Sequence, residues 1–331
     1  MSLRVTTLQG LEQAEKVSRL FAEVHGEGYP VEFYYQPQQL WDSNQAGHTI
    51  SAVATDDEGA VVGHCALFGS APNPRLLKMG AGLVQSSARR TDCLGLLTDE
   101  LLRQARERDL CDWVFSEAVC NQVTFQKTSD RAGFTATAVE VDRMPASGKD
   151  EEGRVSTLLC FLPIKDSRAN LLLPRRYRGI LEEIYETLGV ERHFDTASEE
   201  EEPAEPGVCS VLRNAQAGLL RLTVQTIGLD LPEQLRQEAA VMQLILPLDS
   251  PYLDFAVVEA RDAGFFIAGL LPAWSATDAL LLQRLAAPPD WDRIALQSDF
   301  AKQLLEVIKV DTEAVALRWQ QNAGPVDPVD A

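Results

Sequence analysis

The stretch SSARRTDCLGLL, residues 86–97, decides how the first half of the chain is interpreted. It joins the apolar run LLKMGAGLV (76–84), typical of a strand, to LGLLTDELLRQARERDL (94–110), whose leucines recur at helical spacing. A turn entering a helix presents unpaired backbone N–H groups and the positive end of the helix dipole, which together bind anions. However, Asp92 stands where an anion would have to lie. The pattern predicts a phosphate-binding loop, the remnant of one, or a plain turn.

The segments around this stretch predict alternating helices and strands. The pattern indicates helices at 11–24 and 122–133, a hairpin over 48–69, and strands at 112–119, 134–144 and 154–164. This order predicts an α/β (α+β) domain over residues 1–165, with a mixed, mostly antiparallel, twisted sheet flanked by helices.

Part of the first half recurs in the second. WVFSEAVCNQVTFQKTSDRAGF (113–134) and LILPLDSPYLDFAVVEARDAGF (244–265) both read as strand, turn, helix and Ala-Gly-Phe. We therefore expect two related domains in tandem, the second over 170–331 with a solvated acidic loop at 198–207. A predicted helix at 231–240 is followed directly by a strand at 241–247, which leaves no room for a phosphate loop.

Composition excludes several classes of function. The 331 residues carry a formal net charge of −19, so binding to nucleic acid or anionic lipid through bulk charge is not expected. The start MSLRVTTLQG is not an apolar signal segment, and no apolar run is long enough to span a membrane, which predicts a cytoplasmic protein. The six cysteines form no CxxC pair and the four histidines lack ligand spacing, so no metal site is expected.

Residues 1–165 resemble the GNAT superfamily of acyl-CoA-dependent N-acyltransferases. The resemblance lies in the element order, the position of the loop at about 85–95, and the segment from Asn121 to Phe134. YYQP (34–37), SAVATDDEGAVVGHCAL (51–67) and EAVCNQVTFQK (117–127) are similar to a bacterial GNAT subset that often occurs beside ATPase domains of the anti-sigma-factor type. The second half also resembles this subset, over 246–272 and in DALLLQRL (278–285). The resemblance implies tandem GNAT-like domains, of which the second is degenerate.

The resemblance also implies a co-substrate and a site. Acetyl-CoA would lay its pantetheine arm between the strands at 76–84 and 112–119, and an amine of a small molecule or a protein would attack the thioester directly. Glu117 is the expected general base, and Tyr35 or its neighbour Tyr34 would line the acceptor pocket or donate a proton. A signalling protein is a further expected partner. The residues expected to hold the co-substrate are Leu83, Val84, Arg89, Arg90, Cys93, Leu94 and Gly95.

The chain departs from the family pattern in several places. Arg90 and Asp92 replace loop glycines, Lys78 stands where relatives tend to have Glu, and Ser129 holds the position of a frequent tyrosine acid. We expect Asp92 to cap a helix beginning at Cys93 or Leu94, which would turn its carboxylate away from a phosphate. The departures leave a second interpretation open, a non-catalytic binding or regulatory module on the same fold.

Overall fold

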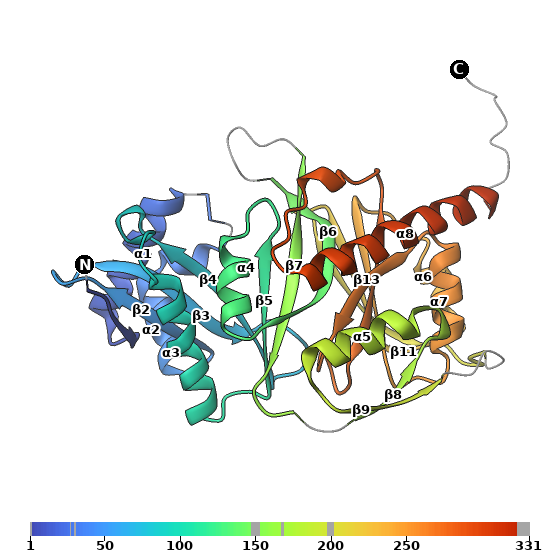
Figure 1. Ribbon diagram of the computed structural model, residues 1–331, viewed down its shortest axis with the longest axis horizontal. Helices are drawn as coiled ribbons and strands as arrows, with labels where there is room; N and C mark the ends of the chain where they lie inside the picture. The colour runs from blue at the N-terminus through green and yellow to red at the C-terminus, as the bar shows by residue number, and fades with distance from the viewer. Residues whose placement is uncertain are drawn as a thin grey trace, which may run out of the picture. The chain divides into compact units, whose positions relative to one another are not determined.

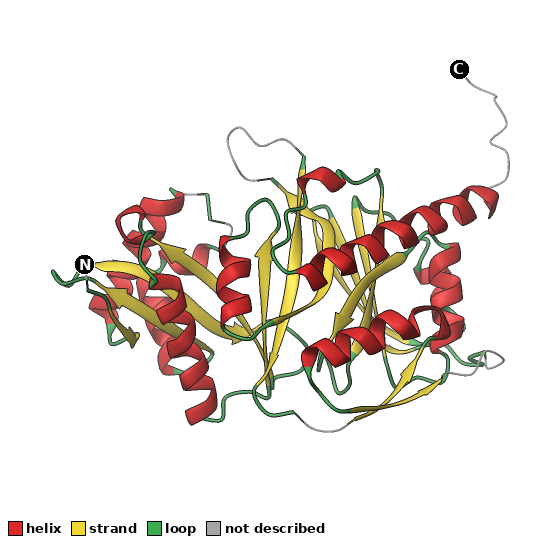
Figure 2. Cartoon of the chain, in the orientation of Figure 1, coloured by secondary structure: helices red, strands yellow, loops and turns green. Residues whose placement is uncertain are grey.

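The computed structural model, drawn in Figures 1 and 2, describes residues 2–26, 28–29, 31–146, 153–166, 169–196 and 202–322. Its chain divides into two compact units. The first contains Met1–Glu117, Thr124–Phe134 and Phe161–Asp166, and the second contains Ala118–Val123, Thr135–Cys160 and Ser167–Ala331. Each unit is described by itself below. The expected loop at 198–207 lies partly outside the described residues.

The first unit is a five-stranded sheet with helices. Its strand order is β1-β2-β3-β4-β5, and neighbours are antiparallel except for the parallel pair β4 and β5. The strands are β1 (Arg4–Thr7), β2 (Thr49–Thr55), β3 (Val61–Gly69), β4 (Leu76–Val84) and β5 (Trp113–Val119). The helices are α1 (Leu11–His25), η1 (Glu32–Tyr35), α2 (Pro37–Gln45), η2 (Ser86–Ala88), α3 (Cys93–Glu107) and α4 (Thr124–Arg131). This confirms the predicted mixed, mostly antiparallel fold class, whereas β1 and α2 were not predicted.

Helices of the first unit cover both faces of its sheet. Gly63 of β3 lies under α3, because a Cβ there would be only 2.5 Å from the Cys93 sulfur and 3.1 Å from Leu97. The next residue, His64, has its ring 5.4 Å from the ring of Phe21 in α1. Successive residues of a strand point to opposite faces. Therefore α3 packs on one face of β3 and α1 on the other.

The second unit has a seven-stranded sheet and a separate two-stranded one. The larger sheet has the order β7-β6-β13-β14-β12-β11-β10, and β8 pairs with β9. Figure 1 labels α5 and α8, which pack on β6 and β13. The strands are β6 (Thr135–Pro145), β7 (Arg154–Pro163), β8 (Ala169–Leu173), β9 (Arg192–Thr196), β10 (Val208–Asn214), β11 (Leu219–Thr226), β12 (Val241–Pro247), β13 (Phe266–Leu271) and β14 (Ala279–Leu285). The helices are η3 (Arg175–Tyr177), α5 (Arg178–Leu188), α6 (Leu231–Gln234), α7 (Leu253–Asp262), η4 (Trp291–Arg293) and α8 (Asp299–Asn322).

The predicted helix at 231–240 is wrong in length. Helix α6 ends at Gln234, although the pattern predicts six more helical residues. The guanidinium of Arg284 donates hydrogen bonds to the carbonyl oxygens of Leu235, at 3.1 Å, and of Gln237. A helix continuing through these residues would need the same carbonyls for its own ladder. A residue of a distant strand therefore overrides the local helical pattern.

The two segments related by sequence have the same local geometry. Gly133 ends α4 with φ 88° and Gly264 follows α7 with φ 87°, a region that favours glycine. The next N–H donates back into each helix, from Phe134 to Ser129 at 3.0 Å and from Phe265 to Ala260 at 2.9 Å. In addition, β11 pairs with β12 in parallel, as β4 does with β5. The tandem origin of the two halves stays a prediction.

Strands β6 and β7 belong mostly to the second unit, although the sequence groups them with residues 1–165. Glu140 of β6 is 1% exposed and accepts hydrogen bonds from Gln243 on β12 at 2.5 Å and Arg221 on β11 at 3.1 Å. A buried carboxylate must be paired, so this residue ties β6 to strands far along the chain. Among the described helices, none has both the length and the apolar character that crossing a bilayer requires.

Candidate functional site

The loop between β4 and α3 is a short helical turn that ends in arginines. After Val84 the chain forms η2, and Arg89 and Arg90 follow with exposed side chains. The first hydrogen bond of the α3 ladder runs from Leu96 N–H to the oxygen of Asp92, at 3.0 Å. The N–H groups of the three residues before it, Cys93 to Gly95, therefore precede the helical ladder. Three amides and two cations thus lie along the stretch predicted to bind phosphate.

Asp92 occupies the N-cap position of α3, and α3 begins at Cys93 as expected, but the predicted capping bond is absent. The Asp92 side chain makes no capping hydrogen bond. It accepts one from Arg131 of α4, at 2.8 Å. The pair lies directly over Gly95, where an added Cβ would be 2.4 Å from Asp92 Oδ1 and would overlap the guanidinium. The prediction that Asp92 turns away to cap is wrong, because an arginine of α4 takes its carboxylate.

Strand β4 parts from β5 beside this loop. The two strands pair from Leu76 opposite Trp113 to Met79 opposite Ser116, and the pairing ends there although β4 runs on to Val84. The ladder between β4 and β3 shifts register within the same stretch, and Ala81 adopts φ 53° there. This is a β-bulge, which bends one strand away from its neighbours. The two residues predicted to line the pantetheine arm, Leu83 and Val84, lie just beyond it.

Glu117 lies on β5 just past the last paired position. Its carboxylate forms an ion pair with Lys78 of β4, with 2.5 Å between Lys78 Nζ and Glu117 Oε2. The side chains of Glu117 and Lys78 are 15% and 21% exposed, respectively. The predicted base therefore stands where β4 and β5 stop pairing, and the ammonium group of Lys78 lies against it. A base role for Glu117 stays a prediction.

Two adjacent tyrosines of η1 differ in how their hydroxyl groups are used. The Tyr35 hydroxyl donates to the oxygen of Gly26 at 2.9 Å and accepts from the N–H of Tyr29 at 3.1 Å. It closes the turn after α1. The Tyr34 hydroxyl has no hydrogen-bond partner within the described residues, although the residue is only 4% exposed. The geometry thus gives Tyr35 a structural task and leaves the hydroxyl of Tyr34 available.

Ser129, at the position where the resemblance implies a tyrosine acid, is a small buried residue. The Ser129 hydroxyl lies 3.3 Å from that of Ser116 on β5, and both side chains are buried. All six cysteines are free thiols. The described residues contain no cluster of three or more histidine, cysteine or carboxylate side chains suited to a metal ion. The roles of Glu117, Tyr34 and Tyr35 in proton transfer stay predictions.

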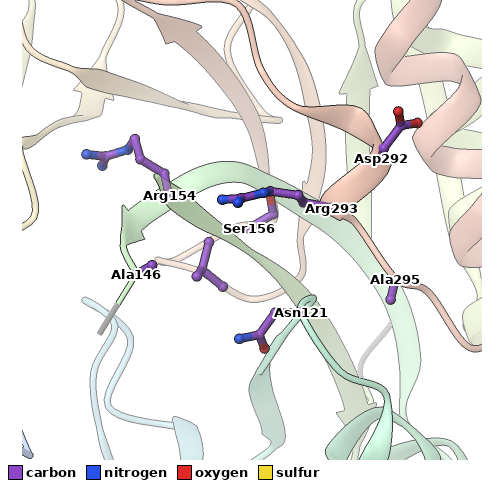
Figure 3. A pocket seen from close by; sticks show the side chains of 8 residues that line it. Asn121, Ala146, Arg154, Ser156, Asp292, Arg293 and Ala295 are labelled. Atoms are coloured by element: carbon purple, nitrogen blue, oxygen red, sulfur yellow. The ribbon is translucent and has the colours of Figure 1, made fainter. Parts of the chain in front are cut away.

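The second unit has a pocket of about 400 Å³, drawn in Figure 3. Its wall includes Arg154, whose guanidinium donates to the carbonyl oxygens of Asp142, at 2.6 Å, and Ala217, at 2.6 Å. Arg293 crosses Gly153, where a Cβ would lie 2.8 Å from its nitrogen. Arg154 thus builds the wall, and the lining mixes charges of both signs. The lining residues are Asn121, Ala146, Arg154, Val155, Ser156, Asp292, Arg293 and Ala295.

Two residues near the loop were missed by the sequence-based predictions. Arg131 lies 39 positions beyond Asp92, so no local pattern marks it as a partner. Its position two residues before Gly133, on the last turn of α4, is the only signal in the sequence. The second is His25, because burial lowers its pKa and the charge of Arg89 on the loop lowers it further.

Comparison with family models returned no match, and neither did comparison with curated proteins. Solved structures of GNAT-family acetyltransferases match about half of the chain. One is an N-acetyltransferase from Staphylococcus aureus (13% identity, TM-score 0.42, covering 50% of this chain and 100% of that chain). Another is an acetyltransferase of the GNAT family from Streptococcus pneumoniae (11% identity, TM-score 0.42, covering 49% of this chain and 99% of that chain). A third is a ribosomal-protein alanine N-acetyltransferase from Escherichia coli (14% identity, TM-score 0.40, covering 50% of this chain and 96% of that chain).

Proposed function

We propose that this chain is an acyl-CoA-dependent N-acyltransferase that moves an acetyl group from acetyl-CoA to an amine. The parting of β4 from β5 beside the N-terminus of α3 carries the proposal. Beside this helix end lie three amides that precede the helical ladder, two exposed arginines and a stretch of β4 that is not paired with β5. Phosphate oxygens suit helix amides and arginine, and an extended amide-bearing arm suits a strand edge.

The residues divide into three tasks under this proposal. Arg89 and Arg90 bind pyrophosphate oxygens from the side, with the amides of Cys93, Leu94 and Gly95. Leu83 and Val84 flank the pantetheine arm. Glu117 accepts the proton that the amine loses as its nitrogen attacks the thioester. The acceptor is a small molecule or a protein, the second half is a degenerate relative of the first, and a signalling protein is a candidate partner.

Two observations favour a second candidate, a non-catalytic binding or regulatory module. Asp92 brings its own carboxylate to the anion site and holds Arg131 there, and Lys78 ion-pairs with the carboxylate proposed as base. Both contacts match a site that has lost its reaction but kept its fold. Binding of acetyl-CoA without release of CoA thiol, over a panel of amines, would favour this module over the enzyme.

The loop arginines provide the direct test. We expect the double variant Arg89→Ala, Arg90→Ala to weaken acetyl-CoA binding by about 1.5–3 kcal/mol, the scale of charge-assisted hydrogen bonds. Isothermal titration calorimetry measures this affinity. The matched control is Arg213→Ala with Arg236→Ala, which removes two exposed arginines from the second unit. Equal affinities in the loop variant and the wild type would place the pyrophosphate elsewhere.

A further inference from the structure

An aromatic cluster covers the α1 face of the first unit beside the bulge of β4. Tyr34 is at its centre, with its ring stacked on Phe21 at 4.6 Å and 5.6 Å from the ring of His64. Leu83 of β4 belongs to the same cluster, and Ala81 packs against it. Tyr34 therefore lies beside the part of β4 that has left β5.

The Tyr34 hydroxyl is unusual among the groups of this cluster. It has no hydrogen-bond partner in the described part of the chain, and it is not among the polar atoms fully shut off from solvent. The hydroxyl therefore remains within reach of water or of a bound ligand. Its ring, by contrast, is enclosed, which fixes where the hydroxyl points. A fixed donor with no partner suits a ligand atom.

Backbone pairing joins β4 and β5 only as far as Met79 and Ser116, so no ladder closes the sheet between the two strands beyond that point. The loop and α3 lie on the face that Gly63 presents, whereas Tyr34 lies on the face that His64 presents. A thioester arm that enters from the α3 side and passes between the strands therefore delivers its acyl end to the face of Tyr34. This path ends beside the bulge, where Ala81 and Leu83 contact the aromatic cluster.

We propose that Tyr34 is a catalytic residue whose hydroxyl donates a hydrogen bond to the acyl carbonyl oxygen of the thioester. The inference rests on the proposed function and names a further residue of that same site. As the amine nitrogen bonds to the carbonyl carbon, the carbonyl electron pair moves onto this oxygen. The pair then returns, the carbon–sulfur bond breaks, and the sulfur leaves as thiolate. The proton lost by nitrogen reaches sulfur through Glu117 or water, so the products are an amide and CoA thiol.

Tyr34 acts in this step as a donor that keeps its proton. Burial raises the pKa of Tyr34 well above its ordinary value of 10, and the neighbouring Tyr29 and Cys65 raise it further. A phenol whose pKa is raised in this way is a weaker acid than a thiol, so it keeps its proton and stabilises the charge that develops on oxygen. Tyr35 supports the arrangement by holding the Tyr29 backbone through its own hydroxyl.

The test compares Tyr34→Phe with the matched variant Tyr35→Phe. Tyr34→Phe removes a hydroxyl without a partner and keeps the ring, so its resistance to urea should equal or exceed that of the wild type. We expect it to bind CoA as the wild type does, because CoA lacks the acyl oxygen. It should bind acetyl-CoA about five-fold more weakly and release thiol from acetyl-CoA about a hundred-fold more slowly.

Tyr35→Phe should show the opposite pattern, with reduced resistance to urea and a smaller change in thiol release per folded molecule. Equal acetyl-CoA affinity and thiol release in Tyr34→Phe and the wild type would overturn the role of Tyr34 and leave the proposed function standing. A wild type that binds neither CoA nor acetyl-CoA would overturn the proposed function itself. Equal losses of CoA and acetyl-CoA affinity in Tyr34→Phe would show a packing role only.

Discussion

A chain of hydrogen bonds fixes His64 as one neutral tautomer. Its Nδ1 lies 2.9 Å from the oxygen of Ala81, and a carbonyl only accepts, so Nδ1 carries the proton. Nε2 must then accept from the Ser51 hydroxyl at 3.1 Å, whose oxygen accepts from Asn44 at 3.2 Å. The imidazole thereby supplies a donor to the carbonyl of a residue with positive φ in the β4 bulge. It acts on the site by holding β4 in shape.

Burial of His64 predicts a loss of stability in mild acid. Burial lowers the pKa of His64 from 6.5 to about 4, so the unfolded chain binds this proton at a higher pH than the folded one. The contribution of neutral His64 to the free energy of unfolding is complete above pH 6.5. It is lost as the pH falls toward 4, and the total loss is about 3 kcal/mol. Urea unfolding from pH 7 to 4 measures it. His64→Asn removes the titrating group, so its stability should fall less steeply over this range.

A pair of variants separates the donor from the ring. The amide nitrogen of His64→Asn takes the place of Nδ1 and can still serve Ala81, whereas that of His64→Gln takes the place of Nε2. At pH 7 we expect the free energy of unfolding of His64→Gln to be about 1–3 kcal/mol lower than that of His64→Asn, because His64→Gln leaves the buried carbonyl of Ala81 without a donor. Equal stability of the two variants would mean that the bulge does not depend on this bond.

At the scale of elements, the first turn of α3 carries the ambiguity of the site. Asp92 and Arg131 are 57% and 54% exposed, so their ion pair contributes little to stability and breaks easily. A phosphate group arriving over Gly95 would compete with the carboxylate for the same guanidinium. The pair therefore lowers the affinity of the loop for anions, and breaking it changes the free energy of unfolding very little.

Asp92→Asn should raise acetyl-CoA affinity about ten-fold, or about 1.4 kcal/mol, because it removes the competing charge and releases Arg131. Asparagine remains a good N-cap residue, so the free energy of unfolding should change by less than about 1 kcal/mol. Titration calorimetry and urea unfolding give the two quantities. Glu58→Gln removes the same charge from the exposed turn between β2 and β3 and serves as the control. An affinity unchanged by Asp92→Asn would show that phosphate does not approach this helix end.

Elements with strong local patterns were predictable, and those fixed by distant partners were not. The leucine spacing and the apolar run predicted α3 and β4, although the helix expected to reach residue 110 ends at Glu107. Helix α2, PQQLWDSNQ, buries only Leu40 and so carries almost no periodic signal. The side chain of Asp92 was misjudged because Thr-Asp before an apolar run is a local capping signal, whereas Arg131 lies on another helix.

At the scale of the whole molecule, the sequence suggests a boundary near residue 165, and the contacts divide the chain differently. The repeat at 113–134 and 244–265 was visible because both segments end in Ala-Gly-Phe after a strand and a helix of matching length. The grouping of β6 was not, because it depends on Glu140 meeting Arg221 and Gln243, which lie 81 and 103 positions away. Pairing of buried charge over such separations leaves no trace in local composition.

A fragment of residues 1–165 should therefore fail to fold as an independent domain. It keeps β6 and β7 but loses Arg221 and Gln243, which leaves the buried carboxylate of Glu140 with Thr157 and Arg143 alone. It also loses Gln283, whose side-chain amide accepts a hydrogen bond from the N–H of Val141 and donates one to the carbonyl oxygen of Val141. Removing one partner of a buried ion pair costs about 3–5 kcal/mol, a large share of the stability of a small domain. Urea unfolding followed by circular dichroism should show no cooperative transition, in contrast to the full chain. A cooperative transition whose free energy of unfolding depends on urea concentration as expected for a folded domain of 165 residues would support the boundary that the sequence suggests.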